Sequence, residues 1–140
     1  MIRVVTGAAG EGKSKSLIAM ANENLKTTKG HIVFIDRDGS HMYTLKHQVR
    51  YINTSDYPLD NHSEFFGFLC GILSRDSDIC DIYVDGLFKL AHLSQIDNPE
   101  KLVQKLKFIS EKFGINITIG IGCTPDKLPE ALKEFEQIDL

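Results

Sequence analysis

The chain is poor in several residue types that mark special classes of protein. It has no Trp, four Pro and three Cys among 140 residues. Cys70, Cys80 and Cys123 are odd in number and scattered, without C-x-x-C spacing, so they indicate thiols in a reducing compartment rather than a disulfide framework. The five His residues form no metal-ligand pattern with these cysteines. The sequence therefore predicts neither a disulfide scaffold nor a zinc site.

An excess of charge of one sign and a long apolar run are also missing. The net charge of −3 gives no electrostatic footprint for nucleic acid or for an anionic membrane surface. No apolar stretch approaches the length of a membrane span, and the first residues enter a strand pattern rather than a signal peptide. We therefore expect a cytoplasmic protein with no membrane or nucleic-acid partner, while a homo-oligomer or a protein partner stays open.

The length and the apolar content are those of one globular unit. The chain is 42% hydrophobic and 25% charged, which is ordinary for a soluble domain. A chain of 140 residues has room for one sizeable core. We expect a single nucleotide-binding domain over residues 1–140, for the reason that follows.

Residues 7–14 read Gly-Ala-Ala-Gly-Glu-Gly-Lys-Ser, a complete G-x-x-x-x-G-K-[ST] phosphate-binding loop (P-loop). An apolar, β-branched run at 2–6 precedes the motif, and a helix-forming segment at 13–25 follows it. A strand, a glycine-rich loop and a helix N-terminus together form a cradle for nucleotide phosphates. The sequence therefore predicts that this segment binds the phosphates of a nucleotide.

The chemistry of the cradle assigns a role to each type of residue in the motif. Glycine lets the backbone approach a phosphate closely, Lys13 places a cation against the β- and γ-phosphates, and Ser14 offers a hydroxyl to Mg²⁺. Lys15 is either a solvated lysine or a contact to the α-phosphate. The predicted nucleotide-binding residues are Gly7, Ala8, Ala9, Gly10, Glu11, Gly12, Lys13, Ser14 and Lys15.

Strand and helix patterns alternate along the rest of the chain. The expected strands are 2–6, 31–36, 49–53, 79–84 and 115–121, and the expected helices are 13–25, 40–48, 62–73, 100–113 and 129–135. This alternation predicts an α/β fold of three layers, with a mostly parallel sheet covered by helices on both faces. Ligands of such sheets bind at the carboxyl ends of the strands, where the motif, Asp36–Asp38, Asp85 and Gly122–Thr124 all fall.

Asp85 ends an apolar strand, Ile82-Tyr83-Val84-Asp85, in the form of a Walker B element. An aspartate in this position usually holds Mg²⁺ opposite the P-loop hydroxyl, so the sequence predicts a metal site between Ser14 and Asp85. The next residue is Gly86, where many hydrolysing P-loop enzymes carry a Glu that activates water. A base must then come from elsewhere, or hydrolysis is poor.

From Ile32 to Leu90 the chain resembles the RecA-type ATPase core. The segment Val33-Phe34-Ile35-Asp36-Arg37-Asp38 is similar to the second strand of that family, which supplies the catalytic carboxylate, and it sets Asp38 at that position. The resemblance implies a RecA-like strand order, in which the strand at 115–121 lies between the P-loop strand and the Asp85 strand. The whole sequence also resembles short bacterial P-loop proteins that are often labelled as twitching-motility (PilT-like) proteins.

The chain departs from the RecA pattern in three respects. Asp38 is one methylene shorter than the Glu of the family, Gly122-Cys123-Thr124 stands where the family has an Asn-Gln sensor, and the last core strand is expected to be absent. We expect a protein that binds ATP with Mg²⁺ and hydrolyses it slowly through Lys13 and Asp38. A GTP preference stays open, although no guanine-reading N-K-x-D occurs. The alternatives are a small-molecule or nucleoside kinase and a non-catalytic nucleotide sensor.

Overall fold

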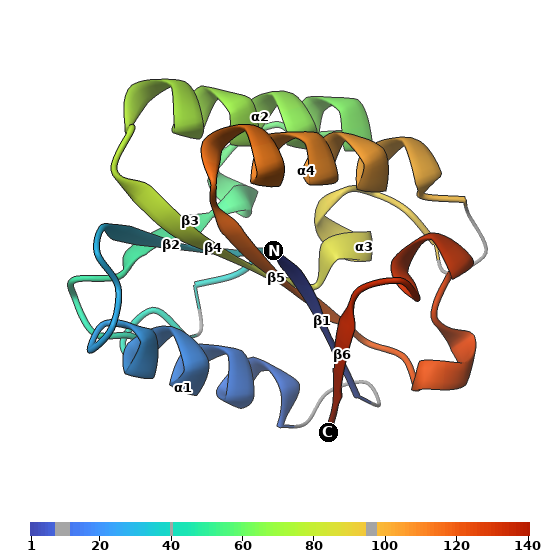
Figure 1. The fold of residues 1–140 in the computed structure, drawn as a ribbon, viewed down its shortest axis with the longest axis horizontal. Coiled ribbons are helices and arrows are strands. Elements are labelled where there is room, and N and C mark those ends of the chain that lie inside the picture. Colours follow the sequence, from blue (N-terminus) through green and yellow to red (C-terminus); the bar gives the residue numbers. More distant parts are fainter. Residues whose placement is uncertain (8–11, 40, 95–97) are drawn as a thin grey trace.

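Six parallel strands form one sheet at the centre of the protein (Figure 1). The computed structural model describes residues 1–7, 12–39, 41–94 and 98–140. The strands are β1 (Ile2–Thr6), β2 (His31–Asp36), β3 (Arg50–Asn53), β4 (Ile79–Asp85), β5 (Asn116–Ile121) and β6 (Glu136–Asp139). They lie in the order β3-β2-β4-β5-β1-β6, and each ladder between neighbours is parallel.

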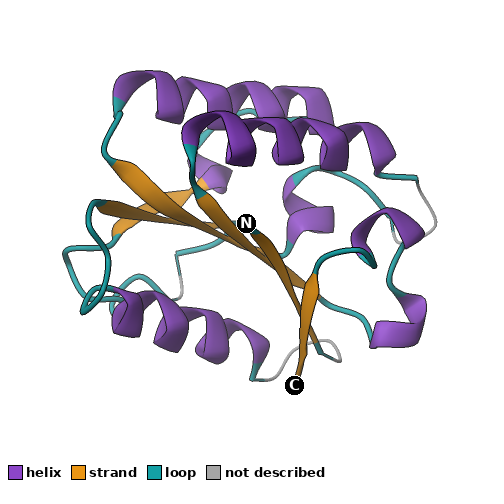
Figure 2. Ribbon diagram, viewed as in Figure 1, coloured by secondary structure: helices purple, strands orange, loops and turns teal. Residues whose placement is uncertain are grey.

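Helices cover both faces of the sheet, which confirms the three-layer α/β prediction. The helices are α1 (Lys13–Asn24), α2 (His62–Arg75), α3 (Leu87–Leu90) and α4 (Glu100–Phe113). Figures 1 and 2 show α2 and α4 side by side over one face and α1 on the other. Among the described residues, we find no helix whose length and apolar content would let it span a membrane.

The alternation of side chains along the strands divides the core into two clusters. Val4 and Val33 belong to the cluster that α2 and α4 cover, whereas Val5 and Phe34 belong to the cluster beneath α1. All four side chains are 1% exposed or less. The central strands of a parallel sheet are buried on both faces, and this explains why their sequences are continuously apolar and do not alternate.

The strand order agrees with the RecA-like prediction. Strand β5 lies between β1 and β4, with Val5 and Asp85 in register with the same residue, Gly120. The predicted cap of α2 is also present, because the side chain of Asn61 accepts a hydrogen bond of 2.9 Å from the amide of Glu64. The left-handed Gly114 (φ 62°) ends α4.

The prediction that the last core strand is absent is wrong. Strand β6 pairs in parallel with β1, and the hydroxyl of Thr6 donates a hydrogen bond of 3.1 Å to the carboxylate of Asp139. The amide of Leu140 donates to the carbonyl of Thr6 at 3.0 Å. The strand escapes sequence analysis because Ile138 is its one apolar residue: at the edge of the sheet, backbone pairing holds a segment that is otherwise polar.

Two predicted helices are also wrong. Residues 41–49 form turns in place of a helix, and residue 40 lies outside the described residues. The side chain of Asn22 on α1 binds this segment, donating to the carbonyl of Thr44 at 3.1 Å and accepting from the amide of Lys46 at 2.8 Å. Residues 129–135 contain one 3₁₀ turn, Glu130–Leu132, and a second 3₁₀ turn, Pro125–Lys127, precedes it. Tertiary hydrogen bonds outweigh local helix propensity in the first segment.

The turn into β2 packs closely against the turn into β4. The amide of His31 donates a hydrogen bond of 2.8 Å to the carbonyl of Asp78, and a Cβ on Gly30 would lie 2.1 Å from that carbonyl oxygen. The same Cβ would lie 2.6 Å from Sγ of Cys80. Gly30 is therefore required by a close approach of two backbone segments.

We predict that Gly30→Ala destabilises the protein by about 2 kcal/mol or more, because the backbone of Asp78 must move to admit the methyl group. The matched control is Gly71→Ala in α2, where a Cβ meets nothing within 4 Å. That substitution should stabilise the protein by about 0.5–1 kcal/mol through helix propensity. Urea denaturation of both variants measures the difference, and equal stabilities would contradict the close approach at Gly30.

Candidate functional site

The site is built where the P-loop motif enters α1. Gly12 precedes the helix with φ 77°, a conformation that favours glycine, and its carbonyl accepts a hydrogen bond of 2.8 Å from the amide of Ser16. The amide of Gly7 donates at 3.0 Å to the carbonyl of Cys123, which ties the start of the motif to the segment that follows β5. The predicted binding residues Ala8, Ala9, Gly10 and Glu11 lie outside the described residues.

The hydroxyl of Ser14 and the carboxylate of Asp85 meet at the carboxyl edge of the sheet. Oγ of Ser14 donates a hydrogen bond of 2.6 Å to Oδ2 of Asp85. Asp85 is 7% exposed at the end of β4, and Ser14 is the second residue of α1. Two residues 71 positions apart in the sequence, both predicted as metal ligands, are therefore in direct contact.

Gly120 in β5 and Gly122 just after the strand leave room for the side chain of Lys13. A Cβ on Gly122 would lie 3.2 Å from Nζ of Lys13, and a Cβ on Gly120 would lie 3.6 Å from its Cε. The Cβ on Gly120 would also meet Leu17 at 2.6 Å. The lysine thus extends along the end of β5, over two positions that carry no side chain. Sequence analysis missed this role, although two glycines at a spacing of two near the end of a strand indicate a close approach.

A cleft of about 550 Å³ opens at this edge. Its lining residues include six that the sequence singled out, namely Lys13, Ser14, Asp36, Asp38, Asp85 and Gly122. Arg37, Gly86, Phe88, Lys89, Leu93 and Ser94 complete the lining. The described lining does not include Lys15, which is exposed, or Thr124. The fold therefore brings Asp38 to the same sheet edge as Asp85, as the sequence predicts.

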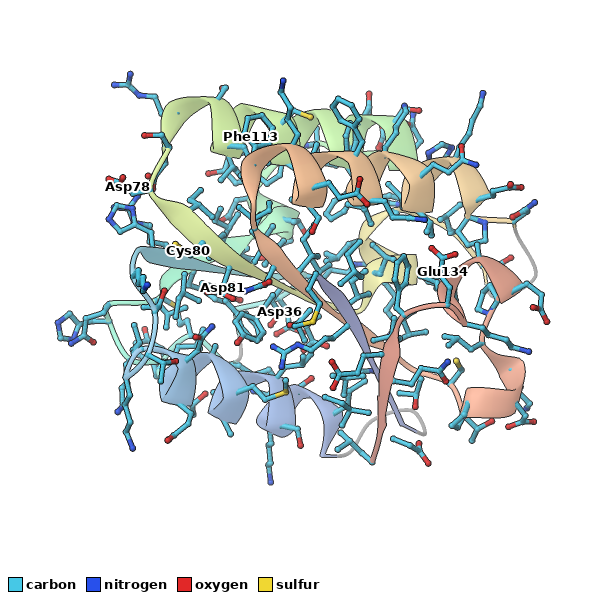
Figure 3. All side chains as sticks on the ribbon, in the orientation of Figure 1. Asp36, Asp78, Cys80, Asp81, Phe113 and Glu134 are labelled. Atoms are coloured by element: carbon cyan, nitrogen blue, oxygen red, sulfur yellow. The ribbon has the colours of Figure 1, made fainter. Side chains whose placement is uncertain are left out.

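Asp36, the last residue of β2, is the most buried of the three carboxylates in the cleft. It is 6% exposed, and Figure 3 shows it well apart from Asp78, which precedes β4 at the opposite end of the strands. Burial raises the pKa of the Asp36 carboxyl, and the neighbouring charges of Asp85 and Asp38 raise it further. A hydrogen bond of 2.6 Å from the amide of Arg37 opposes this shift.

Tyr51 on β3 holds the segment that follows β2. Its hydroxyl donates to the carbonyl of Asp38 and lies 3.5 Å from Oδ2 of Asp36. The ring stacks against Phe34, with centroids 6.4 Å apart. Burial first, and then the charges of Asp36 and Asp38, raise the pKa of Tyr51, so the hydroxyl keeps its proton and remains a donor.

The backbone gives a reason for the glycine at position 86. Gly86 has φ 77° and ψ 54°, in the left-handed region, and it turns the chain from β4 into α3. Its amide donates a hydrogen bond of 3.1 Å to the carbonyl of Gly120. A glutamate here would require a left-handed backbone with a side chain, which L-residues adopt at a cost of roughly 1–2 kcal/mol.

The residues of the cleft fit a hard divalent cation and a polyphosphate. Mg²⁺ takes oxygen ligands such as the Ser14 hydroxyl and the Asp85 carboxylate. Lys13 supplies a cation beside them, and the start of α1 supplies helix amides. The three carboxylates of Asp36, Asp38 and Asp85 give the cleft a negative side that a cation can offset.

The fold is similar to that of a solved archaeal protein, the flagellar accessory protein FlaH from Methanocaldococcus jannaschii. The TM-score is 0.63 at 15% sequence identity, and the match covers 95% of this chain and 65% of the FlaH chain. No protein-family model matches the sequence, and no curated protein matches it. The chain has a RecA-like fold. The likeness to twitching-motility (PilT-like) proteins stays a prediction, because the structural match concerns the fold alone.

We predict that Asp36→Asn raises the melting temperature at neutral pH. An aspartate whose pKa is raised on folding destabilises the protein above its folded pKa, and this penalty disappears as the pH falls to the unfolded pKa of about 4. The gain in the variant should therefore be greatest near pH 7 and vanish near pH 4. Thermal melts across this range measure it, and a gain independent of pH would contradict burial of a charged carboxylate.

Proposed function

We propose that the protein binds ATP together with Mg²⁺ and hydrolyses it slowly. The observation that carries the proposal is the contact of 2.6 Å between Ser14 and Asp85 at the start of α1. In a P-loop site these two groups hold the cation, which neutralises the phosphate charge and can stabilise the transferring phosphoryl group. The complete motif at 7–14 and the RecA-like fold support the same reading.

Lys13 is the residue on which nucleotide affinity should depend most. Its ammonium lies beside Gly122, within the cleft that Ser14 and Asp85 also line. A cation in this position pairs with the β- and γ-phosphates, and the amides of residues 10–14 are proposed to bind the same phosphates at the helix N-terminus. Lys15 is proposed at most as a contact to the α-phosphate, because it is exposed and outside the described lining.

Asp38 is the proposed base or water-orienting residue. It lines the same cleft as Lys13, and Tyr51 donates a hydrogen bond to its backbone carbonyl. An aspartate reaches one methylene less far than the glutamate of the RecA family, and Gly86 offers no carboxylate in its place. Slow turnover follows from a nucleophilic water that is oriented imperfectly.

The alternatives are distinguished by strand order and by chemistry. Direct pairing of the P-loop strand with the Asp85 strand would favour a kinase or GTPase, but β5 lies between them. A non-catalytic nucleotide sensor would bind ATP with the same residues and release no phosphate. Phosphate release, measured with and without a panel of acceptor alcohols, separates hydrolysis, transfer and binding alone.

We predict that Lys13→Ala reduces ATP affinity about 100-fold, because a charge-assisted contact to phosphate is lost while the fold is retained. Gly122→Ala should weaken ATP binding about tenfold, since its methyl group displaces Nζ of Lys13. Titration calorimetry with MgATP measures both. Lys29→Ala, which removes an exposed charge in a loop, is the matched control and should bind as the wild type does. Unchanged affinity in Lys13→Ala would overturn the proposed function.

A second prediction addresses the base. Asp38→Glu should raise the rate of ATP hydrolysis about tenfold, because the added methylene restores the reach of the RecA-type residue. Asp38→Asn should abolish hydrolysis and leave ATP affinity within about twofold, since Asp38 is not a cradle residue. Single-turnover phosphate release measures the rates. Equal rates in the wild type and both variants would assign Asp38 to the Asp-Gly turn, without a catalytic role.

A further inference from the structure

A second cavity of about 140 Å³ adjoins the nucleotide cleft. The two cavities share Arg37, which follows β2, and Lys89, which belongs to α3. Thr54, Ser55, Tyr57, Leu59, Leu90 and His92 complete the lining of the smaller one. Because two residues are common to both linings, a molecule in the second cavity would lie next to the contents of the cleft.

The second cavity has a one-sided charge. Its lining has two permanent cations, Arg37 and Lys89, and no Asp or Glu. Within the described residues, the side chains of these two cations form no hydrogen bond or ion pair. In a protein with a net charge of −3, two neighbouring cations without a carboxylate partner favour an anion.

Polar groups from a second element face the same space. Tyr57 lines the cavity, and its ring packs against Phe68 at a centroid distance of 5.1 Å, which holds the phenol in place. Thr54 donates a hydrogen bond of 3.1 Å to the carbonyl of Asp36, so the wall of the cavity is bonded to the strand end that lines the cleft. Arg, Lys, His and Tyr together offer several donors to one small anion.

His92 occupies a backbone position that glycine usually takes. Its φ of 54° lies in the left-handed region, and it is the one non-glycine residue with positive φ in the described chain. The amide of Leu93 donates to the carbonyl of Phe88 at 2.7 Å, and the amide of His92 donates to Lys89 at 3.3 Å, a Schellman ending of α3. A side chain retained where glycine fits better indicates a use for that side chain.

We propose that this cavity binds the phosphate group of a second small molecule, beside the proposed nucleotide site. The fork of Arg37 matches a phosphate in bidentate geometry, Lys89 adds a point charge, and the His92 ring and Tyr57 hydroxyl offer further donors. The phosphate can come from free inorganic phosphate or from a phosphate monoester. The proposal stands on this cavity alone and does not require that ATP binds in the cleft.

The test is a titration of the ¹⁵N-labelled full chain, without nucleotide, with inorganic phosphate and separately with glycerol 3-phosphate. The amides of Thr54, Ser55 and His92 should shift with a common Kd of about 1–10 mM, as expected for a small site with two solvated cations. Tighter binding of glycerol 3-phosphate assigns the site to a monoester, and tighter binding of inorganic phosphate assigns it to the free ion. The absence of saturable shifts at these amides with either probe overturns the proposal.

The variants separate this site from the P-loop. Arg37→Ala combined with Lys89→Ala should raise the Kd at these amides at least about tenfold, whereas Lys13→Ala, at a residue that lines the cleft and not the second cavity, should change that Kd less than about twofold. Lys29→Ala again controls for the loss of charge and should leave the Kd unchanged. An equal loss of phosphate affinity in Lys29→Ala would show that the effect depends on the overall charge alone, and it would overturn the proposal. Failure of the P-loop function would appear separately, as absent MgATP binding by calorimetry.

His92→Gly gives a test in which thermal stability should rise while the affinity for phosphate falls. Relief of the left-handed backbone should raise the melting temperature by about 2–4 °C. Loss of the ring should at the same time raise the Kd for phosphate at Thr54 and Ser55 at least about threefold. A raised melting temperature with an unchanged Kd would remove His92 from the binding site.

Discussion

The insertion of β5 between β1 and β4 is the constraint on which the site depends. Two steps across a sheet separate β1 from β4 by roughly 9–10 Å. Ser14, at the start of α1, nevertheless bonds Asp85 at the end of β4, so the start of α1 lies close to the β4 side of the sheet. Gly120 in β5 and Gly122 just after it are the matching feature on the sheet, because a Cβ on Gly122 would lie 3.2 Å from Nζ of Lys13 and a Cβ on Gly120 would lie 2.6 Å from Leu17 of α1. Strand order, glycine positions and the candidate metal ligands are thus parts of one arrangement.

The sequence predicted those elements whose signal is local and strong. The central strands are continuous apolar runs, and the cap of α2 is predicted by Asn61 followed three residues later by Glu64. It did not predict β6, because an edge strand held by backbone bonds to β1 needs little hydrophobicity. It predicted a helix over 40–48, where the structure has turns bound by Asn22, a residue on another element. The errors lie where tertiary hydrogen bonds, rather than periodicity, decide the conformation.

The candidate site divides in the same way. Lys13, Ser14 and Asp85 could be named in advance because each belongs to a motif with a fixed place in the fold. The burial of Asp36 could not be predicted, since Asp36 and Asp38 look alike in the sequence and differ only in the packing around them. The second cavity could not be predicted either, because its two cations come from segments about 50 positions apart that the parallel sheet brings together.

The left-handed backbone of Gly86 bears on where a carboxylate could be placed if the proposed hydrolysis were to become faster. A single nucleotide change turns a GGA or GGG glycine codon into a glutamate codon, yet a glutamate immediately after Asp85 would introduce backbone strain at the junction of β4 and α3. Adaptation through position 38 strains no left-handed residue, since none but His92 and three glycines has positive φ in the described chain. The backbone conformation at Gly86 therefore makes position 38 the less strained place for a catalytic carboxylate to evolve.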